Sequence, residues 1–169
     1  MTRFVVGRTQ RLRLGALALI AAIVLPAVWY LGSPLVINHT VEEAAPPGVV
    51  FATNPASVAR RGQFGVIDVI HKGTGRAFLG TLPDGRHILR FERFRVTNGP
   101  TLYVYLSGHP APRTPEQLHT GGAYEVAPLK GNIGNQNYLV PARVDIARFK
   151  SAVIYCKQFH VIFSTATLT

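Results

Sequence analysis

A long apolar stretch near the N-terminus dominates the hydrophobic pattern of the chain. Residues 14–31 contain no charged side chain, and about 20 apolar residues are enough for a helix to cross the hydrocarbon core of a bilayer. Trp29 and Tyr30 lie near the end of this stretch, where amphipathic rings favour the membrane interface. The pattern therefore predicts a transmembrane anchor over residues 14–34, preceded by a cytoplasmic basic tail over residues 1–13.

The charges that flank the apolar stretch predict its orientation. The cations that precede it are Arg3, Arg8, Arg11 and Arg13. By the positive-inside rule, the N-terminus stays in the cytoplasm and the rest of the chain lies in a periplasm or outside the cell. The alternative is a cleaved signal peptide, whose apolar region usually has about 7–15 residues and ends at a small-x-small site. The stretch here is longer and ends in bulky residues, which favours an uncleaved anchor, and both alternatives lead to the same compartment.

Prolines mark the segment that follows the apolar stretch. Pro34, Pro46, Pro47 and Pro55 fall within about two dozen residues, and such a density breaks regular structure and gives a semi-stiff spacer. We therefore expect residues 35–56 to be a linker that separates the membrane from a folded domain.

Residues 57–169 carry short apolar runs separated by turn residues, without the period of a long helix. The expected strands are residues 63–70, 76–82, 86–96, 101–106, 138–140, 151–156 and 159–168. Between them we expect a long loop over residues 107–122, a turn over residues 129–137 and a helical turn over residues 145–150. Many short strands with frequent turns predict an all-β domain. The expected architecture is an antiparallel β-sandwich or barrel-like fold preceded by one N-terminal transmembrane helix.

One strand carries an irregular alternation. Leu89 and Phe91 would share one face of a regular strand over residues 86–96, whereas Phe94 and Val96 would share the other. A one-residue slip reverses the faces of all the side chains that follow it. We therefore predict a β-bulge near Glu92 and Arg93, which would return all four apolar side chains to one face.

The charge of the chain narrows the choice of partners. The formal net charge is +10, and residues 57–169 alone carry 14 cations and 6 anions. A basic domain suits anionic neighbours such as an envelope polymer or lipid headgroups, although a simple solvated surface is the other explanation. The cations are spread along the domain, whereas a nucleic-acid site usually concentrates them in a patch or stripe. We expect no nucleic-acid partner.

An ordered series of segments resembles the DM-thirteen, or electron-transfer DM, domain family over about residues 57–169. The segments that carry the resemblance are residues 62–64, 71–77, 89–94, 98–106, 129–132, 136–138, 149–156, 159, 161, 163, 166 and 168. The resemblance implies a β-sandwich outside the membrane and a redox role for one cysteine, as a bare thiol or as a ligand of a prosthetic group. That cysteine corresponds to Cys156, and the residue before it, commonly Trp in the family pattern, is Tyr155 here.

Cys156 is the single cysteine of the chain, so no internal disulfide can form. It ends an apolar run and precedes Lys157, a cation that would favour the thiolate if it lay beside the sulfur. The other interpretation is a buried cysteine that packs as a small hydrophobic residue. Cys156 is therefore a candidate redox thiol and a candidate cofactor ligand, with both interpretations left open.

His71 and His160 are further candidates for holding a cofactor. Neutral imidazole is a common ligand of metals and of haem iron, and His160 follows Cys156 by four residues. The histidines are otherwise scattered, without paired cysteines or a metal-ligand spacing. The sequence therefore predicts no metal site and names haem as the candidate cofactor only through the resemblance.

Two functions remain at this point. The first is a membrane-tethered extracytoplasmic domain with a redox or electron-transfer role through Cys156, acting with a redox partner protein. The second is a non-catalytic binding or scaffold module at the cell surface that recognises an anionic envelope component. No nucleophile elbow, phosphate loop or usefully spaced carboxylate pair is present, so the sequence does not predict an enzyme.

Overall fold

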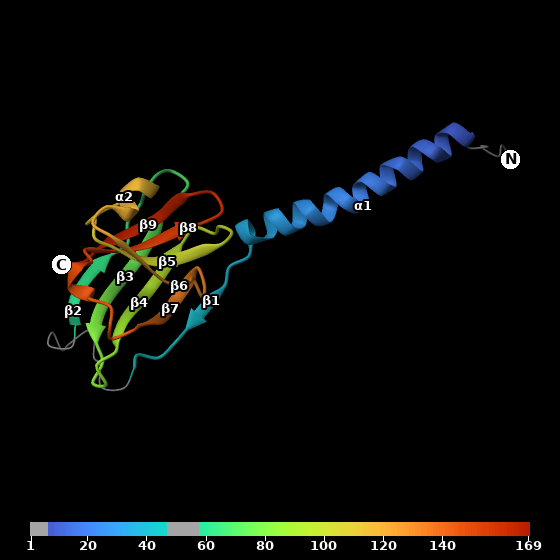
Figure 1. Cartoon of the computed structure of the whole chain (residues 1–169). Helices are drawn as coiled ribbons and strands as arrows, with labels where there is room; N and C mark the ends of the chain where they lie inside the picture. Colours follow the sequence, from blue (N-terminus) through green and yellow to red (C-terminus); the bar gives the residue numbers. More distant parts are fainter. Residues whose placement is uncertain (1–6, 47–57) are drawn as a thin grey trace.

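The computed structural model describes residues 7–46 and 58–169, and its first element is a long helix, α1 (Arg8–Val36). Figure 1 shows α1 extending away from one end of a compact β domain. Its window Arg13–Tyr30 is long and apolar enough to cross a membrane, and none of it is buried inside the molecule. These properties fit an anchor and a signal sequence equally well. The parts of the predicted tail and linker at residues 1–6 and 47–57 lie outside the described residues.

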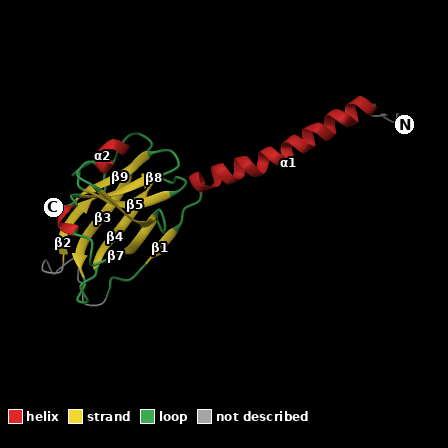
Figure 2. Cartoon of the chain, in the orientation of Figure 1, coloured by secondary structure: helices red, strands yellow, loops and turns green. Residues whose placement is uncertain are grey.

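The domain that follows is made of two β-sheets packed face to face (Figure 2). The first sheet has the strand order β1-β7-β4-β3-β2, and the second has the order β6-β5-β8-β9. The strands are β1 (Thr40–Glu42), β2 (Val58–Gln63), β3 (Gly73–Thr81), β4 (His87–Val96), β5 (Leu102–Ser107), β6 (Ala123–Pro128), β7 (Ile133–Val140), β8 (Ser151–Cys156) and β9 (Val161–Thr167). All pairings are antiparallel except that of β1 with β7. The predicted all-β sandwich is confirmed.

The β-bulge predicted in β4 is confirmed, and it has a counterpart on β3. The register between β4 and β7 shifts between Phe91 and Phe94, and the register between β3 and β4 shifts at Gly75. Arg93 has a φ of 48° and Gly75 a φ of 99°. Because of the extra residue, the apolar side chains before and after the bulge all enter one core. These side chains are Leu89, Phe91, Phe94 and Val96.

The two sheets approach each other most closely along β2 and β9. Phe64 forms a bridge with Ala166, and the backbones of Arg61 and Thr169 exchange hydrogen bonds of 3.0 and 2.9 Å. A Cβ atom on Gly62 would lie 2.2 Å from the carbonyl oxygen of Thr167, so only glycine permits this contact. The sandwich is therefore partly closed on this side, in the manner of a barrel.

Several predicted boundaries are wrong. β2 ends at Gln63, and the residues after it form isolated bridges and a bend, because Asp68 accepts hydrogen bonds from the backbone of Ile70 and His71 and bends the chain. The expected turn over residues 129–137 is mostly strand β7. Strand β6 was not predicted, and β1 adds a strand inside the proline-rich segment.

The outer face of the second sheet carries a cluster of its own. Tyr105 and Tyr155 pack there with edge-to-face rings 5.7 Å apart, beneath Leu118 of the short helix α2 (Pro115–His119). Thr114 caps this helix and Pro115 begins it, which are favoured residues at those positions. The predicted loop over residues 107–122 therefore holds a helical turn that covers tyrosines which would otherwise face solvent. Ile146–Arg148 forms a 3-10 turn within the expected helical turn.

Candidate functional site

Cys156 is the last residue of β8 and is completely buried. Its exposed fraction is 0%, and it belongs to the core between the sheets. Its backbone pairs with Leu102 on β5 and Val161 on β9. The Sγ–H donates a hydrogen bond of 3.0 Å to the carbonyl oxygen of Pro100. The side chain thus packs as a small hydrophobic group whose single polar hydrogen is used.

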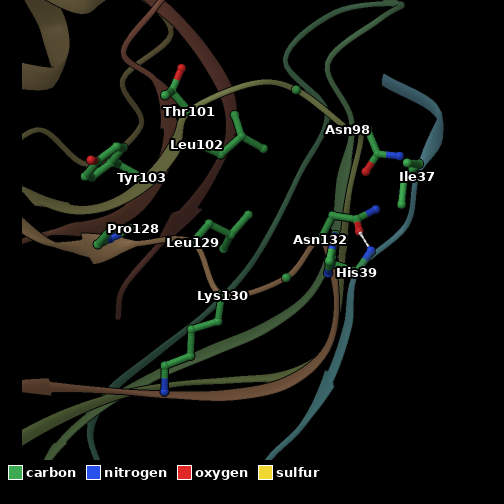
Figure 3. A pocket seen from close by; sticks show the side chains of 12 residues that line it. Ile37, His39, Asn98, Thr101, Leu102, Tyr103, Pro128, Leu129, Lys130 and Asn132 are labelled. Atoms are coloured by element: carbon green, nitrogen blue, oxygen red, sulfur yellow. Dashed lines mark hydrogen bonds between the residues drawn. The ribbon is translucent and has the colours of Figure 1, made fainter. Parts of the chain in front are cut away.

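A pocket of about 430 Å³ is lined in part by the loop that holds Pro100, through Asn98, Gly99 and Thr101 (Figure 3). Three segments line it: the chain directly after α1, the loop from Asn98 to Leu102, and the turn from Pro128 to Asn132. Leu102 lines the pocket and is also the strand partner of Cys156. Cys156 is therefore joined to the lining of the pocket through Leu102, its strand partner, and through its hydrogen bond to Pro100.

Asn132 organises the polar side of the pocket. Its Nδ2 donates to Oδ1 of Asn38 at 2.9 Å, and its Oδ1 accepts from the backbone N–H of His39 at 2.7 Å. Asn98 also donates to Asn38 Oδ1, at 3.1 Å. These bonds fix the chain that leaves α1 against the rim of the pocket, as Figure 3 shows for His39 and Asn132.

A buried network supports the turn at Lys130 and Gly131. Tyr138 donates to Oε1 of Gln136 at 2.6 Å and accepts from the backbone N–H of Lys130 at 3.0 Å. Gln136 in turn donates to the carbonyl of Gly131 at 2.7 Å. Burial raises the pKa of the Tyr138 hydroxyl far above its ordinary value, so this hydroxyl stays protonated and holds the turn in place.

The cation beside Cys156 in the sequence points elsewhere in space. The ammonium of Lys157 binds Glu125 at 2.6 Å and lies 3.9 Å from the centre of the Tyr103 ring. Hydrogen bonds from Lys157 and from Tyr105 lower the pKa of the Glu125 carboxyl. Lys157 is thus committed to the outer face of the second sheet, whereas the thiol of Cys156 faces the core. None of these contacts brings the Lys157 ammonium to the Cys156 sulfur, where the sequence had suggested that it would favour the thiolate.

His71 lies in the loop between β2 and β3. Its Nδ1 is 2.7 Å from Oδ2 of Asp68, and its ring meets the edge of Phe163 at a centroid distance of 4.4 Å. The hydrogen bond from His71 lowers the pKa of Asp68 to about 2. The Phe163 ring also lies against Gly99, so His71 supports the pocket loop through this ring and does not reach Cys156 by any observed contact.

His160 belongs to the opposite face of its sheet. Its Nδ1 lies 3.1 Å from the hydroxyl of Tyr155, a member of the outer cluster. Neighbouring residues on a strand point to opposite faces, so Tyr155 and Cys156 direct their side chains apart. The structure therefore does not bring together the three residues singled out by sequence, namely Cys156, His71 and His160.

The arrangement does not fit a haem ligand set. Cys156 has no exposed surface and its S–H is bonded to Pro100, while His71 and His160 each use a ring nitrogen on a neighbouring side chain. Within residues 7–46 and 58–169, no three His, Cys, Asp or Glu side chains are grouped as metal ligands would be. Coordination through Cys156 would require the loop at Pro100 to move away.

The polar residues of the pocket were missed at the sequence level. Asn38, Asn98 and Asn132 come from three segments far apart in the chain, and their amides meet only in the folded domain. The signal present in the sequence was the asparagine-glycine content of the turns. That content indicates a turn but not which turns meet.

The family comparison adds to this geometry. The family described as Electron transfer DM13 matches residues 65–168, which is more than half of the chain. The chain belongs to this family. The match covers every strand from β3 to β9, so the DM-thirteen domain and the observed sandwich coincide. Searches among curated proteins and among solved structures give no match.

Membership in the DM-thirteen family indicates a role related to electron transfer. The resemblance seen in the sequence is therefore confirmed. The matched region contains Cys156, the single cysteine of the chain, and the pocket loop from Asn98 to Leu102.

Proposed function

We propose that this chain is a membrane-anchored, extracytoplasmic electron-transfer domain that works through Cys156. One observation carries the proposal: the single thiol of a DM-thirteen domain is bonded to Pro100, in the loop that lines a 430 Å³ pocket. The anchor is α1, whose apolar window follows a row of arginines. Arginine and lysine residues that flank a membrane-spanning helix favour the cytoplasmic side. The domain at the other end of the helix then lies in a periplasm or outside the cell.

The chemistry available to a lone thiol is exchange with the disulfide of a partner protein. After loss of its proton to water, the Cys156 thiolate attacks one sulfur of the partner disulfide and forms a mixed disulfide. The second partner sulfur leaves as a thiolate and takes up a proton. One thiol of a reducing partner then attacks the Cys156 sulfur, which releases the first partner's remaining sulfur as a thiol and forms a new mixed disulfide. A second thiol of the reducing partner attacks its own sulfur in that bond and releases the Cys156 thiolate, which takes up a proton. The reducing partner is left with a disulfide, so two electrons have passed from it to the first partner.

This step requires the pocket loop to open. The thiol has no exposed surface and its hydrogen is held by Pro100, so a partner sulfur reaches it only when residues 98–101 move. While the loop is closed, the thiol does not react. When the loop opens on the pocket side, the thiol becomes accessible to a partner. The loop is therefore the gate of the proposed electron transfer.

The test is the reaction of the full chain, in detergent or nanodiscs, with glutathione disulfide. We expect a mixed disulfide on Cys156 under native conditions, reversal by reduced glutathione, and no adduct in Cys156→Ala. The mass of the intact chain reports the adduct. If the native chain forms no adduct over hours whereas the chain in urea does, the thiol is only a structural residue and the redox proposal is wrong.

A second candidate function follows from the burial of the thiol. A domain whose cysteine is fully buried and whose folded part carries 14 cations against 6 anions suits a non-catalytic module that binds an anionic envelope polymer. Such binding depends on screened surface charge and falls as salt is added. Cosedimentation of the chain with an anionic polymer, unchanged in Cys156→Ala and lost at high salt, would favour this candidate over electron transfer.

A further inference from the structure

The exposed apolar side chains of the domain gather at one end. Among the described residues that follow α1, six large hydrophobic residues are exposed, and five of them lie where α1 joins the domain. These five are Ile37, Val66, Val69, Ile70 and Phe159, with exposed fractions up to 85% at Val69. The sixth, Leu139, lies elsewhere on β7. Single exposed hydrophobic residues are ordinary, whereas a gathered set marks a site of contact.

Hydrogen bonds show that these loops form one continuous end. Lys72 and Thr97 exchange backbone and side-chain bonds of 3.0 Å, which join the β2–β3 and β4–β5 loops. The N–H of Lys157 donates to the carbonyl of Thr101, which joins the β8–β9 loop to them. Asn38 bonds Asn98, so the chain leaving α1 enters at this same end (Figure 1). We call these loops, residues 65–72, 97–101 and 157–160, the anchor-side end.

A basic hollow lies beside the apolar tips. Its volume is about 370 Å³, and its charged lining residues are Lys72 and Arg95. Neither side chain has an ion-pair partner in the part of the chain that the structure describes. The acid of the apolar loop, Asp68, is already held by His71. The hollow therefore offers two cations without a carboxylate partner among the described residues to an anionic group.

The anchor brings this end close to lipid headgroups. Ile37 directly follows α1, and a helix rises 1.5 Å per residue, so Ile37 lies about 10 Å beyond Tyr30 along the helix axis. The headgroup region of one leaflet is about 5–8 Å thick. A domain attached at this distance meets the bilayer surface with the end that carries α1.

We propose that the anchor-side end docks on the surface of an anionic phospholipid bilayer. Val69, Ile70 and Phe159 enter the interface, and Lys72 with Arg95 bind lipid phosphates in the basic hollow. This inference rests on the membrane anchor of the proposed function. The pocket in front of Cys156 shares Asn98 and Asn132 with the hollow, so docking turns the pocket toward the bilayer and restricts access to partners that reach the membrane surface.

The test uses the full chain in nanodiscs of phosphatidylglycerol, with a spin label on Val69→Cys, Phe159→Cys or Asp84→Cys. Asp84 lies in the β3–β4 hairpin, at the far end of those strands from Lys72, and a blank with the unsubstituted chain measures any labelling of Cys156. We expect the Val69 and Phe159 labels to relax faster with oxygen than with a water-soluble nickel chelate, and the Asp84 label to show the reverse.

Two results would overturn the inference, and they separate it from the anchor. If the chain enters the discs but all three labels prefer the aqueous reagent, the anchor stands and the docking is wrong. If the chain fails to enter the discs, the anchor of the proposed function is wrong, and the docking falls with it.

A charge-matched pair of variants tests the basic hollow. In Lys72→Glu/Arg95→Glu we expect the ratio of docked to free domain, reported by the Val69 label, to fall at least about thirtyfold. The control, Arg143→Glu/Lys150→Glu, makes the same change of charge at exposed residues of the other end and should leave the ratio within about twofold, since general attraction between surface charges is screened. Equal effects of the two pairs would refute binding in the hollow.

Discussion

The thiol of Cys156 donates its hydrogen to the carbonyl oxygen of Pro100 across 3.0 Å. Pro100 belongs to the loop whose neighbouring residues, Gly99 and Thr101, line the pocket. One weak hydrogen bond thus links the single cysteine of the chain to the loop that lines the pocket. If this loop controls access to the thiol, as proposed above, a change in the loop should change the reactivity of Cys156.

Gly99→Ala should make Cys156 more reactive. A Cβ at Gly99 would lie 2.5 Å from Cζ of the buried Phe163, so the ring or the loop must move. Overpacking costs about 1–3 kcal/mol, and every 1.4 kcal/mol is tenfold, so we expect labelling of the native thiol to accelerate about tenfold or more. The absorbance of released thionitrobenzoate, from labelling with a disulfide reagent, measures the rate.

The control for this labelling experiment is Gly65→Ala. A Cβ there would have its nearest neighbour at 3.9 Å, which is an ordinary contact, so the rate should stay close to that of the unsubstituted chain. If both variants label at the same rate, opening of the pocket loop does not limit access to Cys156.

We expect the purified full chain to lack a Soret band when it is produced with a supply of haem. Cys156 has no face open to a cofactor and neither candidate histidine lies with it. A visible absorption spectrum before and after dithionite checks this. A band that shifts on reduction and disappears in Cys156→Ala would show that the loop opens to admit haem, and would replace the thiol-exchange mechanism.

The carboxyl of Asp68 should titrate with a pKa of about 2, below its ordinary value of 3.8, because His71 and the backbone N–H groups of His71 and Ile70 bond it. A pKa that is lowered in the folded state means that the carboxylate stabilises the loop fully above pH 3.8 and loses this effect as the pH falls toward 2. Carbon NMR of the carboxyl measures the midpoint. In His71→Gln the midpoint should rise; an unchanged midpoint would show that the histidine is not the cause.

Gly75→Ala should destabilise the domain through the bulge. Gly75 has a φ of 99°, and a Cβ there would lie 2.5 Å from the carbonyl oxygen of Arg93. We expect a loss of about 2–4 kcal/mol in the free energy of unfolding, from backbone strain and overpacking together, measured by urea denaturation. Gly85→Ala is the matched control, because Gly85 has a similar φ of 84° with no atom within 4 Å of the new Cβ. Equal losses would mean that the contact with Arg93 contributes nothing.

Patterns that lie within one strand were readable from the sequence. The slip of alternation between Phe91 and Phe94 predicted the β-bulge correctly, and the strand over residues 151–156 was predicted with its observed bounds. Elements that form only through pairing with another strand were not readable from the sequence. The first half of β7 read as a turn because of its glycine and asparagine content, and residues 123–128 were assigned to no element. Both segments are strands, β7 through pairing with β4 and β6 through pairing with β5.

The candidate site was predictable only in its components. The sequence singled out Cys156, His71 and His160, and all three lie within the residues that the family match covers. Alternation along β8 then places Cys156 in the core and Tyr155, with its partner His160, on the outer face. Lys157 likewise binds Glu125 on β6, a strand that the sequence did not reveal.

The sequence by itself determined that this protein has one apolar stretch long enough to span a membrane, a basic all-β domain of the DM-thirteen family and a single cysteine, because composition, hydrophobic period and motif order are properties of the chain alone. Only the tertiary structure decided that the thiol is buried and bonded to Pro100, that three distant asparagines line the basic hollow, and that the exposed apolar loops share the end that carries α1. Such relationships depend on which strands pair and in which register, and a shift of one residue would exchange the core and outer faces.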